Sequence, residues 1–317
     1  MEAEHVEGDD FVYEVLIIGG GPGGLAAAVY SSRAGRKTLI VERELPGGLV
    51  ATTDAIENYP GFPETTGIEL AEHFREHAQR FGAEIVMDNI EEVTLGRDGI
   101  HLARGTSAEY RGKALVVATG SAPRALGVPG EAEFRGRGVS YCATCDAAFF
   151  RDRVVACVGG GDSAVQEALF LARLVEKVYI IHRRDELRAV EVLRRRVEAT
   201  ENVEVVWDSV VEEIKGDATV ESLGLRNVRT GETSDLPVAG VFIYIGYDPA
   251  TGFLGEQLAL DTDGSILANE DTTTEVPGVF AVGDVRSKIQ RQIATAVGDG
   301  ATAGKAIELY LESLETE

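Results

Sequence analysis

One local pattern occurs twice in this 317-residue chain, and its two copies lie 140 residues apart. Tyr13–Ile18 is an apolar run of strand length that enters a glycine-rich turn, and a small-residue helix and a second apolar strand follow. Arg153–Val158 begins the same succession in the second half. Because this succession forms a β-α-β unit, its duplication predicts an α/β fold with two Rossmann-like, three-layer ββα nucleotide-binding domains.

Each unit carries a glycine fingerprint of the type that binds a dinucleotide. The glycines permit a tight turn and let the backbone approach a pyrophosphate, while the helix N-terminus supplies free N–H groups. An ordinary glycine turn is the alternative interpretation of either segment. The fingerprint residues are Gly19, Gly21 and Gly24 in the first unit, and Gly159, Gly161 and Ala164 in the second.

The residue that ends the second strand of each unit indicates which nucleotide fits. The first strand ends at Glu42, whose carboxylate accepts hydrogen bonds from a ribose hydroxyl but repels a phosphate. The second ends at His182, followed by Arg183 and Arg184, with Arg188 further on. Since guanidinium groups bind phosphate through paired hydrogen bonds, we expect NADPH rather than NADH there, and FAD in the first unit. Solvated surface arginines are the alternative.

Cys142 and Cys145 are two of only three cysteines in the chain and are separated by two residues. Such a pair closes a readily reduced disulfide, in which one thiol lowers the pKa of the other. A zinc site needs four ligands, commonly from two such pairs, and the sequence has no second pair. We therefore expect a redox-active disulfide and no metal site, with the third cysteine, Cys157, a small buried hydrophobe.

The charge and hydropathy pattern limits the partners. With 53 acidic and 30 basic residues the net charge is −23, which argues against nucleic acid or an anionic membrane as a partner. No uncharged apolar stretch approaches the about 18 residues of a transmembrane helix, and the acidic N-terminus does not resemble a signal peptide. The few cysteines favour a catalytic disulfide in a reducing cytoplasm.

Two connectors set the expected domain layout: the Pro/Gly-rich segment Ser121–Gly130 and the segment Tyr247–Pro249. A chain that leaves its first domain near residue 122 and returns near 247 has one domain inserted in the other. We expect an FAD-binding domain from residues 1–122 and 248–317, with 1–11 disordered, and an NADPH-binding domain from 123–247 that carries the cysteine pair. Two connectors that cross together permit a hinge rotation.

Taken in order, the motifs resemble those of the low-molecular-weight thioredoxin reductases, the class II pyridine nucleotide-disulfide oxidoreductases. The resemblance spans about residues 12 to 314, and its specificity lies in the order and spacing of motifs that are individually modest. Besides the first glycine turn, the motifs are Asn58-Tyr-Pro-Gly61, Ala118-Thr-Gly120, Cys142-Ala-Thr-Cys-Asp146, Gly159-Gly-Gly-Asp-Ser163, His182-Arg-Arg184 with Arg188, Gly283-Asp284 and Arg291-Gln292.

The resemblance implies a homodimeric flavoprotein that transfers electrons from NADPH through FAD and the Cys142–Cys145 disulfide to oxidised thioredoxin. It implies that Cys145 is the sulfur nearest the flavin and that Cys142 attacks thioredoxin. Asp146 would act as general acid or base, with helix capping as its alternative. The remaining implied contacts are Asn58, Ala118, Thr119, Gly120, Gly283, Asp284, Arg291 and Gln292 for FAD, and Asp162 and Ser163 for NADPH.

One position departs from the family pattern, because Leu49 follows Gly47 and Gly48 where the family usually has Gln. This departure puts the efficiency of NADPH use in doubt more than the fold. Arg137 is the expected docking residue for an acidic thioredoxin, and a solvated turn is its alternative. The competing functions are reduction of another small disulfide protein or a peroxidase-linked partner, a flavin NADPH–ferredoxin reductase, and a non-catalytic nucleotide-sensing module.

Overall fold

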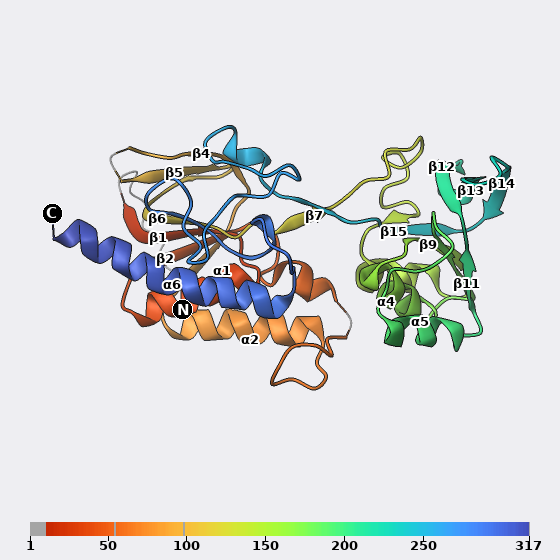
Figure 1. The fold of residues 1–317 in the computed structure, drawn as a ribbon, viewed down its shortest axis with the longest axis horizontal. Coiled ribbons are helices and arrows are strands. Elements are labelled where there is room, and N and C mark those ends of the chain that lie inside the picture. The colour runs from red at the N-terminus through yellow and green to blue at the C-terminus, as the bar shows by residue number, and fades with distance from the viewer. Residues whose placement is uncertain (1–10, 54, 98, 317) are drawn as a thin grey trace. The chain divides into compact units, whose positions relative to one another are not determined.

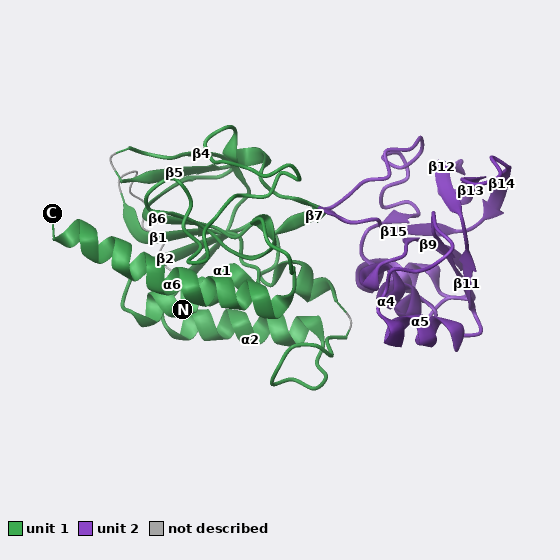
Figure 2. Ribbon diagram, in the orientation of Figure 1, with its two compact units in different colours: residues 1–122, 248–317 green, residues 123–247 purple. Residues whose placement is uncertain are grey.

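The computed structural model describes residues 11–53, 55–97 and 99–316 (Figure 1). The chain divides into two compact units: unit 1 comprises residues 1–122 and 248–317, and unit 2 comprises residues 123–247 (Figure 2). Unit 2 is therefore inserted in the sequence of unit 1. Of the segment expected to be disordered, residues 1–10 lie outside the described residues. Phe11 is described, and its ring contacts that of Tyr13 at a centroid distance of 4.8 Å.

Unit 1 is built on a sheet whose parallel part has the order β3-β2-β1-β6, and β17 pairs in parallel with the C-terminal half of β6. The strands β4 and β5 extend this sheet in antiparallel fashion. The strands are β1 (Val12–Ile18), β2 (Thr38–Glu42), β3 (Glu84–Met87), β4 (Ile90–Thr94), β5 (His101–Gly105), β6 (Glu109–Val117) and β17 (Val279–Ala281), and the helices are α1 (Pro22–Arg33), α2 (Gly67–Arg80) and α6 (Ile293–Glu315).

The two faces of β1 explain the three layers of unit 1. Successive residues of a strand point to opposite faces, and here both faces are buried. Val15 and Ile17 pack in a cluster with residues of α1 and α6, such as Leu25. Leu16 packs on the other face with residues of β4 and β5 and of the segment before β17. The buried part of the strand, residues 15–18, therefore has to be apolar on both faces, and the sequence Val-Leu-Ile-Ile meets this requirement.

Unit 2 repeats this plan with an all-parallel sheet of order β11-β10-β9-β15-β8 and a separate antiparallel sheet β12-β13-β14. On β9, Val155 and Cys157 pack with residues of α4 and α5, while Ala156 and Val158 pack with residues of the antiparallel sheet. The strands are β8 (Val139–Ser140), β9 (Val154–Gly159), β10 (Lys177–Ile181), β11 (Val203–Val206), β12 (Ser209–Gly216), β13 (Val220–Asn227), β14 (Thr233–Pro237) and β15 (Gly240–Tyr244), and the helices are α3 (Ala143–Asp146), α4 (Asp162–Leu171) and α5 (Glu191–Glu198).

The predicted fold class is therefore confirmed: both glycine fingerprints lie between the first strand and the helix of a β-α-β unit. The segments that connect the units, β7 (Ser121–Pro123) and β16 (Tyr247–Pro249), pair with each other as a two-stranded sheet. The remaining elements are short 3₁₀ helices: η1 (Gly48–Thr52), η2 (Ala147–Phe150), η3 (Gly252–Leu254) and η4 (Gly283–Val285).

The C-terminal helix α6 has 23 residues and packs closely on α1. A Cβ atom at Gly300 would lie 2.2 Å from the carbonyl oxygen of Gly23, and one at Gly304 would lie 2.3 Å from the Cβ atom of Tyr30. The missing side chains therefore allow the two helices to approach. Neither α6 nor any other helix within the described ranges combines the length and apolar character needed to cross a membrane.

Candidate redox and nucleotide sites

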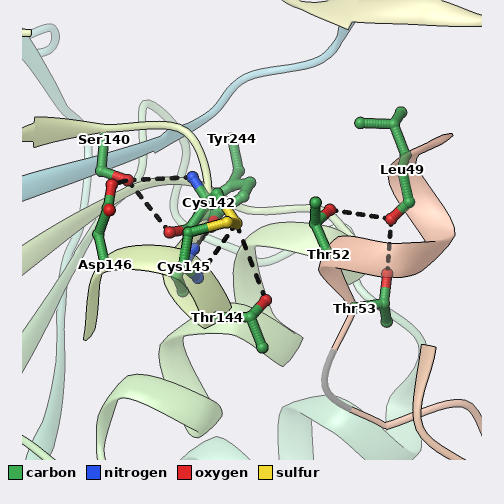
Figure 3. The surroundings of a disulfide bond; sticks show 10 residues. Leu49, Thr52, Thr53, Ser140, Cys142, Thr144, Cys145, Asp146 and Tyr244 are labelled. Carbon is green, nitrogen blue, oxygen red and sulfur yellow. Dashed lines mark hydrogen bonds between the residues drawn. A yellow bond between two sulfur atoms is a disulfide. The ribbon is translucent and has the colours of Figure 1, made fainter. Parts of the chain in front are cut away.

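The cysteine pair lies where β8 leads into the short helix α3, and its sulfurs form a disulfide (Figure 3). Cys142 occupies the residue before the helix, and its Sγ atom accepts a hydrogen bond from the backbone N–H of Cys145 at 3.2 Å. A donor aimed at this sulfur favours the thiolate form once the disulfide is opened. This local geometry therefore suits Cys142 to act as a nucleophile.

Two hydroxyl groups that the sequence did not single out hold the disulfide segment. The Ser140 hydroxyl donates to Oδ2 of Asp146 at 2.6 Å and accepts the N–H of Cys142 at 3.0 Å. The Tyr244 hydroxyl, from the end of β15, accepts the N–H of Ala143 at 2.8 Å. Burial raises the pKa of Tyr244, so this hydroxyl stays protonated. Asp146 ends α3 and makes no capping bond, so the capping alternative is wrong.

A buried carboxylate links this segment to the connector. Glu131 accepts the backbone N–H groups of Leu126 and Gly127 and the hydroxyl of Tyr141, the last at 2.6 Å. Burial opposes ionisation of Glu131, but these hydrogen bonds outweigh it and lower the pKa of its carboxyl. Burial and the same contact raise the pKa of Tyr141 to about 12. Because Tyr141 precedes Cys142, Glu131 fixes the connector to the redox segment.

The glycine turn of unit 1 leaves space for a ligand at the N-terminus of α1. A Cβ atom at Gly19 would lie 2.4 Å from the oxygen of Ala118, and one at Gly24 would lie 2.0 Å from the oxygen of Gly19, so both positions exclude a side chain. By contrast, no described atom lies within 4 Å of a Cβ atom built at Gly21, the residue that precedes α1. Glu42 adjoins the turn and accepts the N–H of Gly20. This cradle fits a pyrophosphate.

The glycine turn of unit 2 has the same form as that of unit 1, but different side chains surround it. A Cβ atom at Gly161 would also meet open space, whereas one at Gly160 would lie 2.3 Å from the imidazole ring of His182. His182 is 4% exposed, and burial lowers its pKa. The neutral ring therefore supports the turn from beneath. Asp162 begins α4 and accepts the N–H of Val190, and Ala164 is fully buried.

The arginines beyond β10 are available to an anion. Arg183, Arg184 and Arg188 are exposed, and none of them forms an ion pair with a carboxylate in the parts of the chain that the structure describes. The charge of the two units differs in the same sense: unit 1 contains 33 acidic and 14 basic residues, whereas unit 2 contains 20 and 16. The unit with the free guanidinium groups therefore repels a polyanion far less.

Unit 1 brings several of the other predicted residues together. Asn58 donates to the side-chain oxygen of Gln292 at 3.1 Å, although 234 positions separate them in sequence. Arg291 donates to the hydroxyl of Ser265 at 3.0 Å and to the carbonyl oxygen of Asp284 at 3.4 Å. Thr119, between Ala118 and Gly120, donates its hydroxyl to the Ala250 carbonyl at 2.8 Å.

Asp284 provides a test of cofactor fit. Its Oδ1 atom is buried and has no hydrogen-bond partner among the described residues, and burial raises the pKa of this carboxyl. A buried polar atom without a partner costs free energy unless a ligand satisfies it. Together with the open cradle at Gly21, the carboxyl of Asp284 fits a cofactor that carries hydroxyl groups beside a pyrophosphate, as FAD does.

Leu49 and Arg137 were also singled out from the sequence. Leu49 lies in η1 and is 40% exposed, and its carbonyl accepts the hydroxyls of Thr52 and Thr53 (Figure 3). Arg137 donates to the carbonyls of Glu133 and Ala218, so part of its guanidinium is already bonded.

Cys157 is fully buried, as predicted, and burial raises its pKa. Its thiol contacts the carbonyl oxygen of Ala164 at 3.2 Å. Within the residues that the structure describes, no group of three or more His, Cys, Asp or Glu side chains is placed to hold a metal ion.

Comparisons with known proteins agree with this geometry. Residues 13–300 match the family model described as pyridine nucleotide-disulphide oxidoreductase, so the chain belongs to this family. A protein from Peptoclostridium litorale named thioredoxin reductase is 46% identical over 313 residues, which cover 96% of this chain and 99% of the relative. The Bacillus subtilis protein of that name is 44% identical, covering 97% of each chain. The Lactococcus lactis thioredoxin reductase structure superposes with a TM-score of 0.92 at 43% identity, covering 95% and 99%.

We predict that Glu131→Gln destabilises the protein in a pH-dependent way. Because the folded-state pKa lies below the unfolded value of about 4.3, the ionised carboxyl stabilises the fold above that pH, and the stabilisation disappears as the pH falls through the folded-state pKa. At pH 7 the variant should lose about 1–3 kcal/mol of unfolding free energy, measured by urea denaturation. Glu133→Gln, an exposed neighbour, is the control; equal losses for both variants at pH 7 would contradict the role of Glu131.

Proposed function

We propose that this chain is an NADPH-dependent flavoprotein that reduces the disulfide of thioredoxin. The observation that carries the proposal is the Cys142–Cys145 disulfide, in a chain whose near full-length relatives are thioredoxin reductases. A flavin NADPH–ferredoxin reductase or a nucleotide-sensing module would need no such pair. The relatives' names favour thioredoxin over other small disulfide proteins as the substrate.

FAD and NADPH are the cofactors of this function. FAD, when bound, supplies two-electron transfer between NADPH and the disulfide. We assign FAD to unit 1 and NADPH to unit 2, on the support of the two open cradles, the partnerless carboxyl oxygen of Asp284 and the free arginines. The proposed FAD residues are Gly19, Gly21, Gly24, Glu42, Asn58, Ala118, Thr119, Gly120, Gly283, Asp284, Arg291 and Gln292, and the proposed NADPH residues are Gly159, Gly161, Asp162, Ser163, Ala164, His182, Arg183, Arg184 and Arg188.

The chain's own chemistry is thiol–disulfide exchange. After two-electron reduction of the pair, the Cys142 thiolate attacks one sulfur of the thioredoxin disulfide, which forms a mixed disulfide and releases one thioredoxin thiolate. The Cys145 thiolate then attacks the sulfur of Cys142, which re-forms the internal disulfide and releases the second thioredoxin thiolate. The N–H contact from Cys145 to the Cys142 sulfur supports the assignment of Cys142 as the nucleophile.

Asp146 is proposed as the general acid that protonates a departing thiolate. The hydrogen bond from Ser140 supports this role, because it anchors the Asp146 carboxyl beside the segment that carries both sulfurs.

The working assembly is proposed to be a homodimer in the cytoplasm, where a reducing environment lets a single disulfide cycle. The two paired connectors would serve as the hinge between the units. Arg137 is proposed to help dock an acidic thioredoxin. Two of its guanidinium N–H groups donate to backbone carbonyls, and the remaining N–H groups would bind the partner's carboxylates. Sedimentation at working concentration tests the dimer; a monomer that is fully active would contradict it.

We predict that Cys142→Ser separates the two halves of the reaction. Without the attacking sulfur the variant should still bleach the flavin absorption when NADPH is added anaerobically, but thioredoxin reduction should fall to the assay background. Cys157→Ala is the control, because Cys157 is buried in the core of unit 2 and should leave turnover intact. Normal thioredoxin reduction by Cys142→Ser would disprove the assignment.

We predict that Asp146→Asn slows thioredoxin reduction by about a hundredfold, since the amide cannot transfer a proton. The acid–base limb that Asp146 contributes should also disappear from the pH profile of kcat/KM. Asp217→Asn, an exposed carboxylate of the same unit, should leave both unchanged. An unaltered pH profile in Asp146→Asn would contradict the acid role.

We predict that the double variant Arg183→Ala/Arg184→Ala raises the KM for NADPH by at least about tenfold, because two charge-assisted contacts to the 2′-phosphate are lost. The KM for NADH, which lacks that phosphate, should change little. Arg195→Ala is the matched control, since Arg195 is exposed but paired with Glu191. Equal changes for the two nucleotides would remove the phosphate-binding role.

A further inference from the structure

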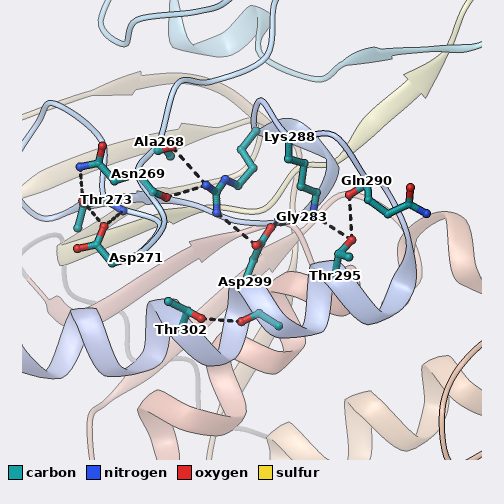
Figure 4. Close-up of polar contacts among 12 residues, drawn as sticks. Ala268, Asn269, Asp271, Thr273, Gly283, Lys288, Gln290, Thr295, Asp299 and Thr302 are labelled. Carbon is teal, nitrogen blue, oxygen red and sulfur yellow. Dashed lines mark hydrogen bonds and ion pairs between the residues drawn. The ribbon is translucent and has the colours of Figure 1, made fainter.

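A carboxylate of α6 connects three donors beside the turn that contains Asp284 (Figure 4). Asp299 accepts the backbone N–H of Gly283 at 3.0 Å, the ammonium of Lys288 at 2.8 Å and the guanidinium of Arg286 at 3.2 Å. The side chains of all three charged residues are at most 16% exposed. Charged groups this poorly solvated are strongly coupled, so the arrangement depends on Asp299.

The same network reaches a third segment of unit 1. The guanidinium of Arg286 also donates to the carbonyl oxygens of Ala268 at 3.2 Å and Asn269 at 2.6 Å. Asp299 therefore holds together the segment at residues 268–269, the turn at Gly283 and the helix α6. No sequence pattern indicated this role, because Asp299 is one of many acidic residues in an acidic chain.

The two residues of the Gly283–Asp284 turn have different roles in this network. Gly283 has a φ of +76°, and its N–H group donates to Asp299, so Gly283 contributes to the proposed FAD site through the conformation of the turn and not through this amide. The group that remains is the Asp284 carboxyl, whose buried Oδ1 atom has no hydrogen-bond partner among the described residues. Asp284 is thus the ligand-facing side of a turn that Asp299 holds from the other side.

Asp299 also fixes the position of the Lys288 ammonium group. Lys288 and Arg291 both act electrostatically on Asp284. Lys288 donates to Asp299 and, at 3.4 Å, to the hydroxyl of Thr295, but not to Asp284. Because a lysine side chain is long and flexible, loss of its carboxylate partner would free it to pair with Asp284. Such an ion pair would occupy the oxygen that the structure leaves open.

We infer that Asp299 is a positioning residue for FAD. It anchors the Gly283–Asp284 turn and keeps Lys288 away from the Asp284 carboxyl, so that this carboxyl is free to accept a hydrogen bond from a hydroxyl of FAD. The inference rests on the proposed binding of FAD in unit 1. It assigns to Asp299 an indirect effect on FAD retention, which does not depend on a contact between Asp299 and the cofactor.

The first test measures FAD retention by purified holoprotein. FAD per chain and the fluorescence of FAD released on serial dilution are compared for wild type, Asp299→Asn, Asp299→Leu and Glu308→Gln. Glu308 is the control because it lies on α6 and its carboxylate pairs with Lys305. Asp299→Asn should raise the apparent Kd for FAD at least about tenfold, and Asp299→Leu more, since the amide keeps an acceptor for Gly283. Circular dichroism at the assay temperature confirms that each variant is folded. A folded Asp299→Asn protein with wild-type Kd overturns the inference.

The second test is a rescue that a purely structural role would not show. If misdirected Lys288 blocks Asp284, then Asp299→Asn/Lys288→Met should retain FAD better than Asp299→Asn alone. A double variant that retains FAD no better overturns the part assigned to Lys288. The proposed function fails separately, and recognisably, if wild-type protein purifies without FAD.

Discussion

The close approach of a helix start to the end of a buried strand governs both nucleotide sites. In unit 1 there is room for no side chain at Gly24, because a Cβ atom there would lie 2.0 Å from the carbonyl oxygen of Gly19. In unit 2 a side chain is likewise excluded at Gly159, because a Cβ atom there would lie 2.6 Å from the Cβ atom of Ala164. This packing aims the free N–H groups of each helix at the space above the turn. The strand burial that fixes the layers therefore also fixes where a pyrophosphate can bind.

On this shared backbone, the side chains at the rim distinguish the two sites. Glu42 presents a carboxylate at the end of β2. After β10, a neutral, buried His182 is followed by Arg183, Arg184 and Arg188, which form no ion pair with a carboxylate among the described residues. A neutral imidazole adds no charge of its own, so the cations of this segment are its arginines. The proposed assignment of FAD to unit 1 and NADPH to unit 2 therefore depends on a few residues at the end of the second strand of each unit.

The sequence predicted the parts of the fold and site that depend on local patterns. Strand burial, glycine spacing and the cysteine pair are all read within a few residues, so both β-α-β units and the disulfide could be placed. Tyr244 could not, because its contact with Ala143 joins residues 101 positions apart. Ser140 lies only two residues before Cys142, but a serine in a short strand carries no distinctive signal. The function was predicted from the order and spacing of the whole set of motifs, and no single residue would have indicated it.

The distribution of cations explains how such an acidic chain can bind anionic cofactors. Unit 1 has more than two acidic residues for each basic one, yet Arg286, Lys288 and Arg291 all lie within one short segment near Asp284. Two of them, Arg286 and Lys288, are paired with Asp299 and are largely buried. Their charges therefore stabilise the local structure and are poorly accessible to solvent. In unit 2, Arg183, Arg184 and Arg188 form no ion pair with a carboxylate among the described residues. A cation held by a buried carboxylate shapes the backbone around a site, whereas an unpaired cation is available to a phosphate. Unit 1 has the first arrangement at Asp299, and the exposed Arg183, Arg184 and Arg188 of unit 2 have the second.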